Sequence, residues 1–378
     1  MPFRIGIDAH GVGGIGLAAG NETFISNLLK KLQIIDEEND YTVFVSKSDV
    51  FDTLNHSNFK TIKLFSNTQW IQRGISLPLY LLKNRLDLIH VSSVLPPYCP
   101  AKSIITLHDI FHEEYEELYT PLEYKRMKTL IPINAKKADK IITVSNYSKQ
   151  QIIKHYNITE DKIDVIYNSV DKNTFRILGN REETQNYIRS NYGINDEFIL
   201  YVGTLQPRKN VERLLNAYFE LKKDGGALPK LVIVGKKGWK YKQIFDRISE
   251  FGLERDVIFT GYVPLTDLVY FYNGALLFVF PSIAEGFGIP PLEAMACGTP
   301  VICSNTTCFP EIVGDSAMLI NPFDSNDIYS ALKNAINKKE IREKYISRGL
   351  VQIEKFSWYR SALKLHHIYK EVLDTIHS

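Results

Sequence analysis

The sequence has little of what marks disulfide-linked, membrane-spanning or strongly charged proteins. Its four cysteines among 378 residues show neither C-x-x-C spacing nor histidine partners at the spacing of a zinc site, which predicts reduced thiols in a cytoplasmic protein. The formal net charge of +2 gives no reason to expect nucleic acid as a partner. No apolar run approaches the ~20 residues that span a bilayer, and the first residues, MPFRIGID, lack the apolar stretch of a signal peptide.

Short β-rich apolar runs alternate with amphipathic helical patterns along most of the chain. This alternation is typical of βαβ units, whose parallel strands are buried on both faces. We expect one series of strands at 4–8, 41–46, 88–91, 103–107, 140–144 and 163–166, and a second at 198–202, 230–234, 257–260, 276–280 and 300–303. Helices are expected between them, among others at 22–32, 145–155, 211–222 and 241–252.

A polar stretch without a strand, DKNTFRILGNREETQNYIRSNYGIND, separates the two series. The length of the chain also favours two hydrophobic cores over one. We therefore predict two doubly wound α/β domains, residues 1–175 and 176–357, with a C-terminal amphipathic helix at 358–378 that packs back on the first. Ligands of such sheets bind at the carboxyl ends of the strands, so two domains facing each other would form a cleft.

The stretch FVFPSIAEGFGIPPLEAMACGTPVICS carries the most chemistry. Glu285 falls in the loop after a buried strand, and Glu293 falls in the next helix. Pro290 and Pro291 suit the first turn of that helix. The glycines between the two glutamates let the backbone approach a ligand, and a helix start attracts phosphate. One segment thus combines two carboxylates for hydroxyl groups with an anion site, as binding of a nucleotide sugar requires.

This segment resembles the E-x7-E donor motif of retaining glycosyltransferases of family 4, which have the GT-B fold. YVGTLQPRKNVERLLNAY resembles the diphosphate-binding segment of that family. Four more stretches resemble other segments of the family, namely TLHD, VIYNSVD, FTGYVPLTDLVYFYNGA and FPEIVGDSAMLINPFD. The resemblance covers essentially the whole chain. It implies two Rossmann-like domains facing across a cleft, the first binding the acceptor and the second the donor, and catalysis without a metal or another cofactor.

The same resemblance implies which residues bind the donor. Glu285 would bind hydroxyls of the transferred sugar, and Glu293 would bind the ribose hydroxyls. The backbone at Phe287, Gly288 and Ile289 would meet the sugar and the diphosphate.

The segment QPRKN would supply the positive charge for the diphosphate. Arg208 could grip phosphate through two hydrogen bonds, and Lys209 could act as a point charge. The family usually has an arginine directly after the glycine of this segment, but here Thr204 follows Gly203. Whether Arg208 takes the role of that arginine is left open by the sequence.

Three further residues receive roles from the resemblance. His108, after the expected strand at 103–107, would face the sugar from the first domain, and Tyr262 and Val263 would flank the nucleobase.

A diphosphate leaving group needs little protonation. The resemblance therefore implies front-face transfer in which the departing phosphate takes the acceptor's proton, and Glu285 would not be a nucleophile.

The glycines at residues 11–16 spell G-x-G-x-x-G, which also occurs in NAD-binding proteins. Two residues separate the expected strand from the first glycine, and no acidic residue closes the second strand, so the rest of that fingerprint is missing. A helix is expected to begin near Asn21, a good N-cap residue. We therefore expect a longer loop whose backbone near Gly14 and Gly16 approaches the donor phosphates and the acceptor.

The favoured function is transfer of a hexose to a glycan or a lipid-linked acceptor in surface polysaccharide or glycoconjugate synthesis. VGKKGWKYKQIF resembles a stretch found among bacterial mannosyltransferases, so GDP-mannose is the favoured donor and UDP sugars of the glucose or GlcNAc type come next. The alternatives are an NAD-dependent oxidoreductase, a phosphorylase with the same fold, and a noncatalytic partner subunit.

The stretch from Lys125 to Lys154 holds eight basic residues and a single acidic one, Asp139. Apolar neighbours such as Met127 and Leu130 accompany them. The pattern fits a solvated helix face, and it also fits a surface that contacts anionic lipid on the inner face of a membrane.

Overall fold

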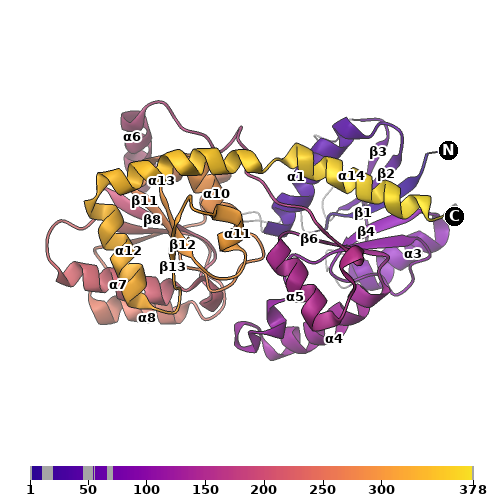
Figure 1. The fold of residues 1–378 in the computed structure, drawn as a ribbon, viewed down its shortest axis with the longest axis horizontal. Coiled ribbons are helices and arrows are strands. Elements are labelled where there is room, and N and C mark those ends of the chain that lie inside the picture. Colours follow the sequence, from indigo (N-terminus) through magenta and orange to yellow (C-terminus); the bar gives the residue numbers. More distant parts are fainter. Residues whose placement is uncertain (1, 11–19, 46–53, 55, 66–70, 377–378) are drawn as a thin grey trace. The chain divides into compact units, whose positions relative to one another are not determined.

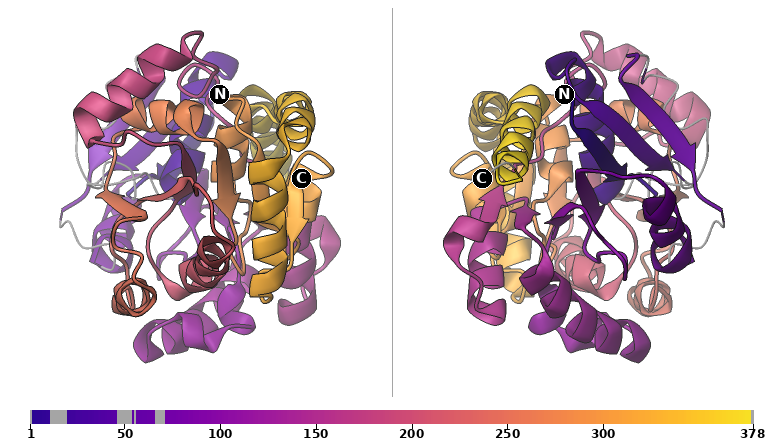
Figure 2. Two further views of the ribbon diagram at one scale, coloured as in Figure 1. Left: turned by 90° about the vertical axis from the view of Figure 1, so that its left-hand side faces the viewer. Right: turned by 90° about the vertical axis from the view of Figure 1, so that its right-hand side faces the viewer.

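The computed structural model describes residues 2–10, 20–45, 54, 56–65 and 71–376. The chain forms two compact units (Figure 1). The first comprises Met1–Asn168 and Ser357–Ser378, and the second comprises Ser169–Phe356. In each unit helices cover both faces of a parallel sheet, as the two side views show (Figure 2).

The first unit is built on a seven-stranded sheet with the order β3-β2-β1-β4-β5-β6-β7. Its strands are β1 (Arg4–Asp8), β2 (Asp40–Val45), β3 (Phe59–Lys63), β4 (Leu88–Ser92), β5 (Lys102–Thr106), β6 (Lys140–Thr143) and β7 (Ile163–Val165). Ile7 of β1 pairs with Val43 on one side and with His90 on the other. The strand order reverses between β1 and β4, and ligands of doubly wound sheets bind at such a point.

Helices of the first unit are α1 (Gly20–Ile35), α3 (Leu77–Lys83), α4 (Pro121–Lys137), α5 (Asn146–Tyr156) and α14 (Trp358–Asp374). Shorter turns are η2 (Gln72–Ser76), η3 (Phe111–Glu113), η4 (Glu116–Leu118) and η5 (Glu160–Lys162). The C-terminal α14 belongs to this unit because it packs on α1, and the hydroxyl of Tyr369 is hydrogen-bonded to His90 of β4 at 2.7 Å.

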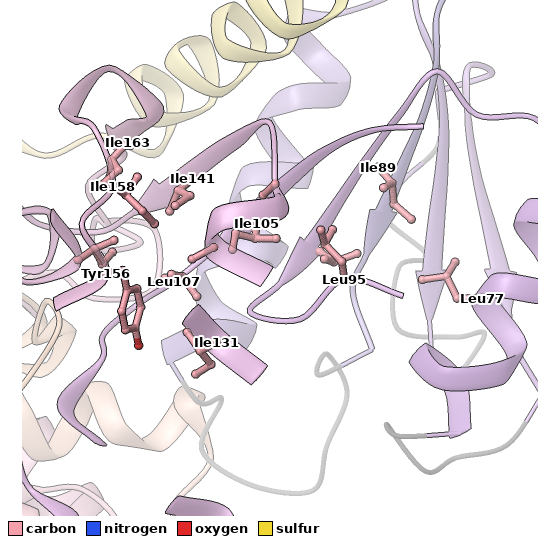
Figure 3. Packing of buried hydrophobic residues seen from close by; sticks show 14 of the residues in the cluster. Leu77, Ile89, Leu95, Ile105, Leu107, Ile131, Ile141, Tyr156, Ile158 and Ile163 are labelled. Carbon is pink, nitrogen blue, oxygen red and sulfur yellow. The ribbon is translucent and has the colours of Figure 1, made fainter. Parts of the chain in front are cut away.

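The core of the first unit is a layer of branched aliphatic side chains between sheet and helices. Ile89, Ile105 and Ile141 come from three neighbouring strands and are fully buried. Ile131 of α4 and Tyr156 of α5 pack against this cluster (Figure 3). This packing joins the central strands of the sheet to α4 and α5.

The second unit has a six-stranded sheet with the order β10-β9-β8-β11-β12-β13. Its strands are β8 (Phe198–Val202), β9 (Lys230–Val234), β10 (Val257–Gly261), β11 (Leu277–Phe280), β12 (Val301–Ser304) and β13 (Met318–Ile320). Its helices and turns are α6 (Arg181–Tyr192), η6 (Pro207–Lys209), α7 (Val211–Lys223), α8 (Lys242–Phe251), α9 (Leu265–Gly274), α10 (Ile289–Ala296), α11 (Phe309–Val313), α12 (Ser325–Asn337), α13 (Lys339–Gln352) and η7 (Ile353–Lys355).

All eleven expected strands are present, and no end is shifted by more than one residue. Two strands at sheet edges, β3 and β13, were not expected. β3 carries exposed lysines and β13 has only three residues, so neither shows the continuous apolar pattern of a central strand. None of the helices in the described ranges combines the length and apolar composition that crossing a bilayer requires.

Candidate functional site

Glu285 lies in the loop between β11 and α10, at the carboxyl edge of the second sheet. Its side chain is only 12% exposed. One carboxylate oxygen, Oε1, accepts a hydrogen bond from Ser282 Oγ at 2.7 Å and lies 2.6 Å from Lys209 Nζ and 2.8 Å from an Arg208 nitrogen. Burial opposes ionisation, but the charges of Arg208 and Lys209 outweigh it and hold the pKa of Glu285 at about 2. The carboxylate is therefore ionised at neutral pH.

The two cations reach Glu285 because their loop is anchored to the loop after β11. Asn210, which has a left-handed φ of 59°, is buried and donates through Nδ2 to the carbonyls of Pro281 at 3.0 Å and Pro322 at 2.6 Å. The carbonyl of Arg208 accepts from the amide of Ile283 at 2.9 Å. Sequence analysis did not identify Asn210 or Ser282. An asparagine directly after R-K was the available signal, since asparagine tolerates left-handed backbone.

The start of α10 is shaped by a glycine and two prolines. Gly288 has a φ of 82°, and a Cβ there would meet the Phe309 ring at 2.8 Å. Pro290 and Pro291 have no backbone N–H. The N–H donors that remain at the start of this helix are therefore those of Gly288 and Ile289. The anion site expected here therefore has fewer donors than an ordinary helix N-terminus.

Glu293 lies in α10 and differs from Glu285 in its electrostatic environment. The Tyr272 hydroxyl donates to its Oε2 at 2.8 Å. Burial raises the pKa of Glu293 to about 7, and the Tyr272 hydrogen bond only partly opposes this. The two carboxylates of the E-x7-E segment thus have different protonation behaviour, one ionised and one titrating near neutrality.

Gly203 and Thr204 follow β8 at the same edge of the sheet. The Gly203 amide donates to the Val234 carbonyl at 2.9 Å, and a Cβ on Gly235 would lie 2.0 Å from the Gly203 carbonyl oxygen. The two strand ends can approach this closely only because Gly235 has no side chain. Thr204 is partly exposed and is uncharged, so its side chain cannot supply the positive charge of an arginine at this position.

Tyr262 and Val263 follow β10. The Tyr262 ring is 42% exposed, and Lys236 Nζ lies 5.4 Å from its centre, so the ring can stack with a base. Val263 is fully buried. No atom of Val263 is therefore accessible to a ligand in this conformation, and its expected contact with the nucleobase stays a prediction.

His108, after β5 of the first unit, packs edge-on against Phe24 at a ring distance of 5.1 Å. Burial lowers the pKa of His108 to about 4, so the ring is neutral at physiological pH. Its carbonyl accepts from Ser148 Oγ at 3.2 Å. Gly14 and Gly16 lie outside the described residues.

Asp8 and His10 form a buried pair at the end of β1 that sequence analysis did not single out. His10 Nδ1 is hydrogen-bonded to Asp8 Oδ1, and Arg73 Nε donates to Asp8 Oδ2 at 2.8 Å. Burial opposes ionisation of Asp8, but Arg73 and His10 hold its pKa well below the usual range. An aspartate that ends a strand, followed two residues later by histidine, was the signal for this pair.

The basic residues between Lys125 and Lys154 do not share one helix, because α4, β6 and α5 divide them. Lys128 pairs with Glu113 and Lys149 with Glu160, and Lys140 lies 2.9 Å from Glu371 and 3.2 Å from Asp164. Three of the eight basic residues in this stretch are therefore paired with carboxylates. Within the described part of the chain, no group of three or more His, Cys, Asp or Glu side chains is placed to hold a metal ion.

Comparisons with known proteins identify the family of this chain. A family model described as "Glycosyl transferases group 1" matches residues 176–351, and one described as "Glycosyltransferase Family 4" matches residues 21–174. O-antigen chain mannosyltransferase B of Escherichia coli is 32% identical over 72% of this chain and 71% of its own length. Serotype-specific mannosyltransferase WbdA of the same organism is 32% identical over 70% of this chain, which spans about a third (32%) of that longer relative.

Among solved structures, sucrose-phosphate synthase from Thermosynechococcus elongatus has a similar fold. Its TM-score is 0.79 at 20% sequence identity, and the match covers 99% of this chain and all (100%) of the other. The two parallel α/β units of this chain thus match the GT-B fold. On these grounds the chain belongs to glycosyltransferase family 4, a family of retaining hexosyltransferases that use nucleotide-sugar donors.

Proposed function

We propose that this enzyme transfers a hexose, with mannose favoured, from a nucleotide diphosphate sugar to a glycan or lipid-linked acceptor in surface polysaccharide synthesis. The observation that carries the proposal is the cluster of Glu285 with Arg208 and Lys209 at the carboxyl edge of the second sheet. In this proposal the carboxylate of Glu285 accepts sugar hydroxyls, and the two cations beside it bind the diphosphate. Family membership leaves no support for the oxidoreductase alternative.

The cluster holds two cations 2.6 and 2.8 Å from one carboxylate oxygen of Glu285, where a bound diphosphate would compete with the carboxylate for them. Breaking the bond between sugar and phosphate increases the negative charge on the diphosphate. Cations that are already held in place stabilise that charge without reorganisation. We propose that Arg208 and Lys209 turn from Glu285 towards the diphosphate, while Glu285 accepts hydrogen bonds from the sugar.

GDP-mannose is the favoured donor, because relatives of this chain are described as mannosyltransferases. UDP sugars remain the second candidate. A calorimetric titration with GDP-mannose, UDP-glucose, UDP-GlcNAc and ADP-glucose separates them. Binding of GDP-mannose alone supports the assignment, preference for a UDP sugar replaces it, and binding of none contradicts the proposed function.

Glu285→Gln is expected to reduce kcat/KM about 10²-fold, because glutamine loses the charge that accepts sugar hydroxyls and balances two cations. No covalent glycosyl–enzyme species should accumulate in intact-protein mass spectrometry, with either the parent enzyme or the variant. We expect this because Glu285 is proposed to bind and orient the sugar, and its carboxylate already accepts hydrogen bonds from Ser282 and Lys209. A trapped sugar on Glu285 would show instead that it is the nucleophile.

Donor affinity is expected to rise with pH between about 6 and 8, because ribose hydroxyls donate best to ionised Glu293, whose pKa is about 7. One pH unit below that pKa only about a tenth of the carboxyl is ionised, so Kd should be about tenfold higher at pH 6 than at pH 8. The groups near its carboxyl are the hydroxyl of Tyr272 and the thiol of Cys297, and burial raises the pKa of both, so neither titrates in this range. Calorimetry with the intact nucleotide sugar measures the slope, because its diphosphate is esterified at both ends and does not titrate in this range, whereas the terminal phosphate of a nucleoside diphosphate does. Glu293→Gln should bind more weakly and independently of pH, and a slope that survives this substitution would assign it to another group.

A further inference from the structure

The helical segment formed by Ile71, η2 and α3 carries a stripe of exposed apolar side chains. Figure 1 labels α3 in the first unit. The stripe consists of Ile71 (39% exposed), Ile75 (50%), Leu79 (46%) and Leu82 (60%). Spacings of four, four and three residues place these side chains on one side of the helix. On the other side, Leu77 and Leu81 are buried in the core of the first unit (Figure 3 labels Leu77). The segment is therefore apolar on two faces. One face is buried in the core, and the other is exposed.

In the stretch of sequence that contains the stripe the charged residues are all basic, and one of them, Arg73, is paired with Asp8. No Asp or Glu occurs between Asp52 and Asp87, whereas this interval contains five Lys or Arg residues, namely Lys60, Lys63, Arg73, Lys83 and Arg85. Lys83 follows Leu79 by four residues, so the apolar stripe ends in a cation on the same face. An exposed apolar stripe bordered by cations is typical of a helix that lies in a membrane interface.

A pocket of about 440 Å³ adjoins the C-terminal end of α3. The cations that line it are Arg4, Lys60, Lys83 and Arg85, and among its lining residues Asp40 is the one carboxylate. Tyr80, Asn58 and Thr42 contribute hydroxyl and amide groups to the lining, and buried Leu86 also lines the pocket. Arg4 is also held by a pair of hydrogen bonds to Asp87, at 3.0 and 3.2 Å. The pocket thus offers an excess of positive charge beside the apolar stripe.

We propose that this face docks the first unit on an anionic phospholipid surface. The stripe enters the acyl boundary, and the pocket receives the headgroup phosphate of an anionic lipid. A second copy of the chain fits less well, because pairing two such faces would bring two cationic edges together. The stretch from Lys125 to Lys154 fits less well too, because three of its lysines already pair with carboxylates.

Vesicle co-sedimentation of the full chain, without a donor sugar, tests this surface independently of transfer. Vesicles contain phosphatidylcholine with or without phosphatidylglycerol. The double variant Ile75→Ser/Leu82→Ser should lower partitioning to the anionic vesicles about tenfold or more. The matched control Leu122→Ser/Ile133→Ser removes equally exposed apolar side chains from α4, at 74% and 57% exposure, and should leave partitioning unchanged.

The charge contribution is tested with Lys83→Gln and Arg85→Gln, each expected to weaken partitioning about fivefold at low salt. Lys136→Gln/Lys137→Gln on α4 is the control. Loss of binding in the α4 variants but not in the stripe variants would overturn the proposal in favour of that surface. Partitioning that does not depend on phosphatidylglycerol would also overturn it, as would a dimer in analytical ultracentrifugation that only the stripe variants dissociate.

Discussion

Lys209→Gln is expected to lower kcat by about 10²- to 10³-fold, the size of effect seen when a single preorganised donor to a developing negative charge is removed. Lys209 is 12% exposed, and its Nζ is held between Glu285 at 2.6 Å and the face of the Phe280 ring at 4.7 Å. Glutamine fits this space but carries no charge. Because the lost interaction strengthens as the sugar–phosphate bond breaks, kcat should fall more than the affinity for the donor.

Two further variants make the experiment decisive. Lys209→Arg keeps the charge and should recover part of the activity, whereas Lys339→Gln removes a cation that is 79% exposed on α13 and should have no effect. Steady-state kinetics with the preferred donor gives kcat and KM separately. Equal loss in donor binding and kcat would indicate that Lys209 binds the ground state only, and unchanged turnover would exclude it from the site.

Gly235→Ala is expected to have the largest effect on stability, about 3 kcal/mol or more, because overpacking here involves two backbones that cannot rotate away. The added Cβ would lie 2.0 Å from the carbonyl oxygen and 2.7 Å from the carbonyl carbon of Gly203. To relieve this contact the ends of β8 and β9 must separate. Gly203 and Thr204 would then move, and with them the loop that carries Lys209.

Hydrogen exchange followed by mass spectrometry can detect this effect within the second unit. Amides of β8 and β9 should lose protection in Gly235→Ala, while those of the first unit keep theirs. Gly179→Ala is the matched control, since a Cβ there meets nothing within 4 Å. Unchanged protection in Gly235→Ala would contradict the prediction, because it would show that the ends of β8 and β9 separate without a loss in the free energy of unfolding.

Much of the fold could be predicted because its central strands are unambiguous in sequence. β8, with all five residues FILYV buried, shows the continuous apolar run of a strand that is covered on both faces. β3 was not predicted because its position at the edge of the sheet leaves Lys60 and Lys63 exposed, which removes that pattern. Strand recognition thus depended on burial on both faces, and it failed where one edge is open.

The candidate site was predictable in its chemistry but not in its geometry. Glu285 and Lys209 were recognisable from local motifs, yet they are 76 residues apart in sequence. Their contact depends on Asn210, which ties one loop to the carbonyls of another. Hydrogen bonds to backbone carbonyls have no sequence signature on the accepting side, so this anchor was visible only in three dimensions.

The sequence by itself determined the alternation of strands and helices, the residue types at the carboxyl ends of the strands and the family resemblance, because all of these are local patterns. The tertiary structure decided which of two identical side chains is ionised. Glu285 is held ionised by two cations, and Glu293 is raised to a pKa of about 7 by burial. It also decided which apolar residues of the segment from Ile71 to Leu82 enter the core and which remain exposed. Both outcomes depend on what packs around a residue, and distant parts of the chain supply that environment.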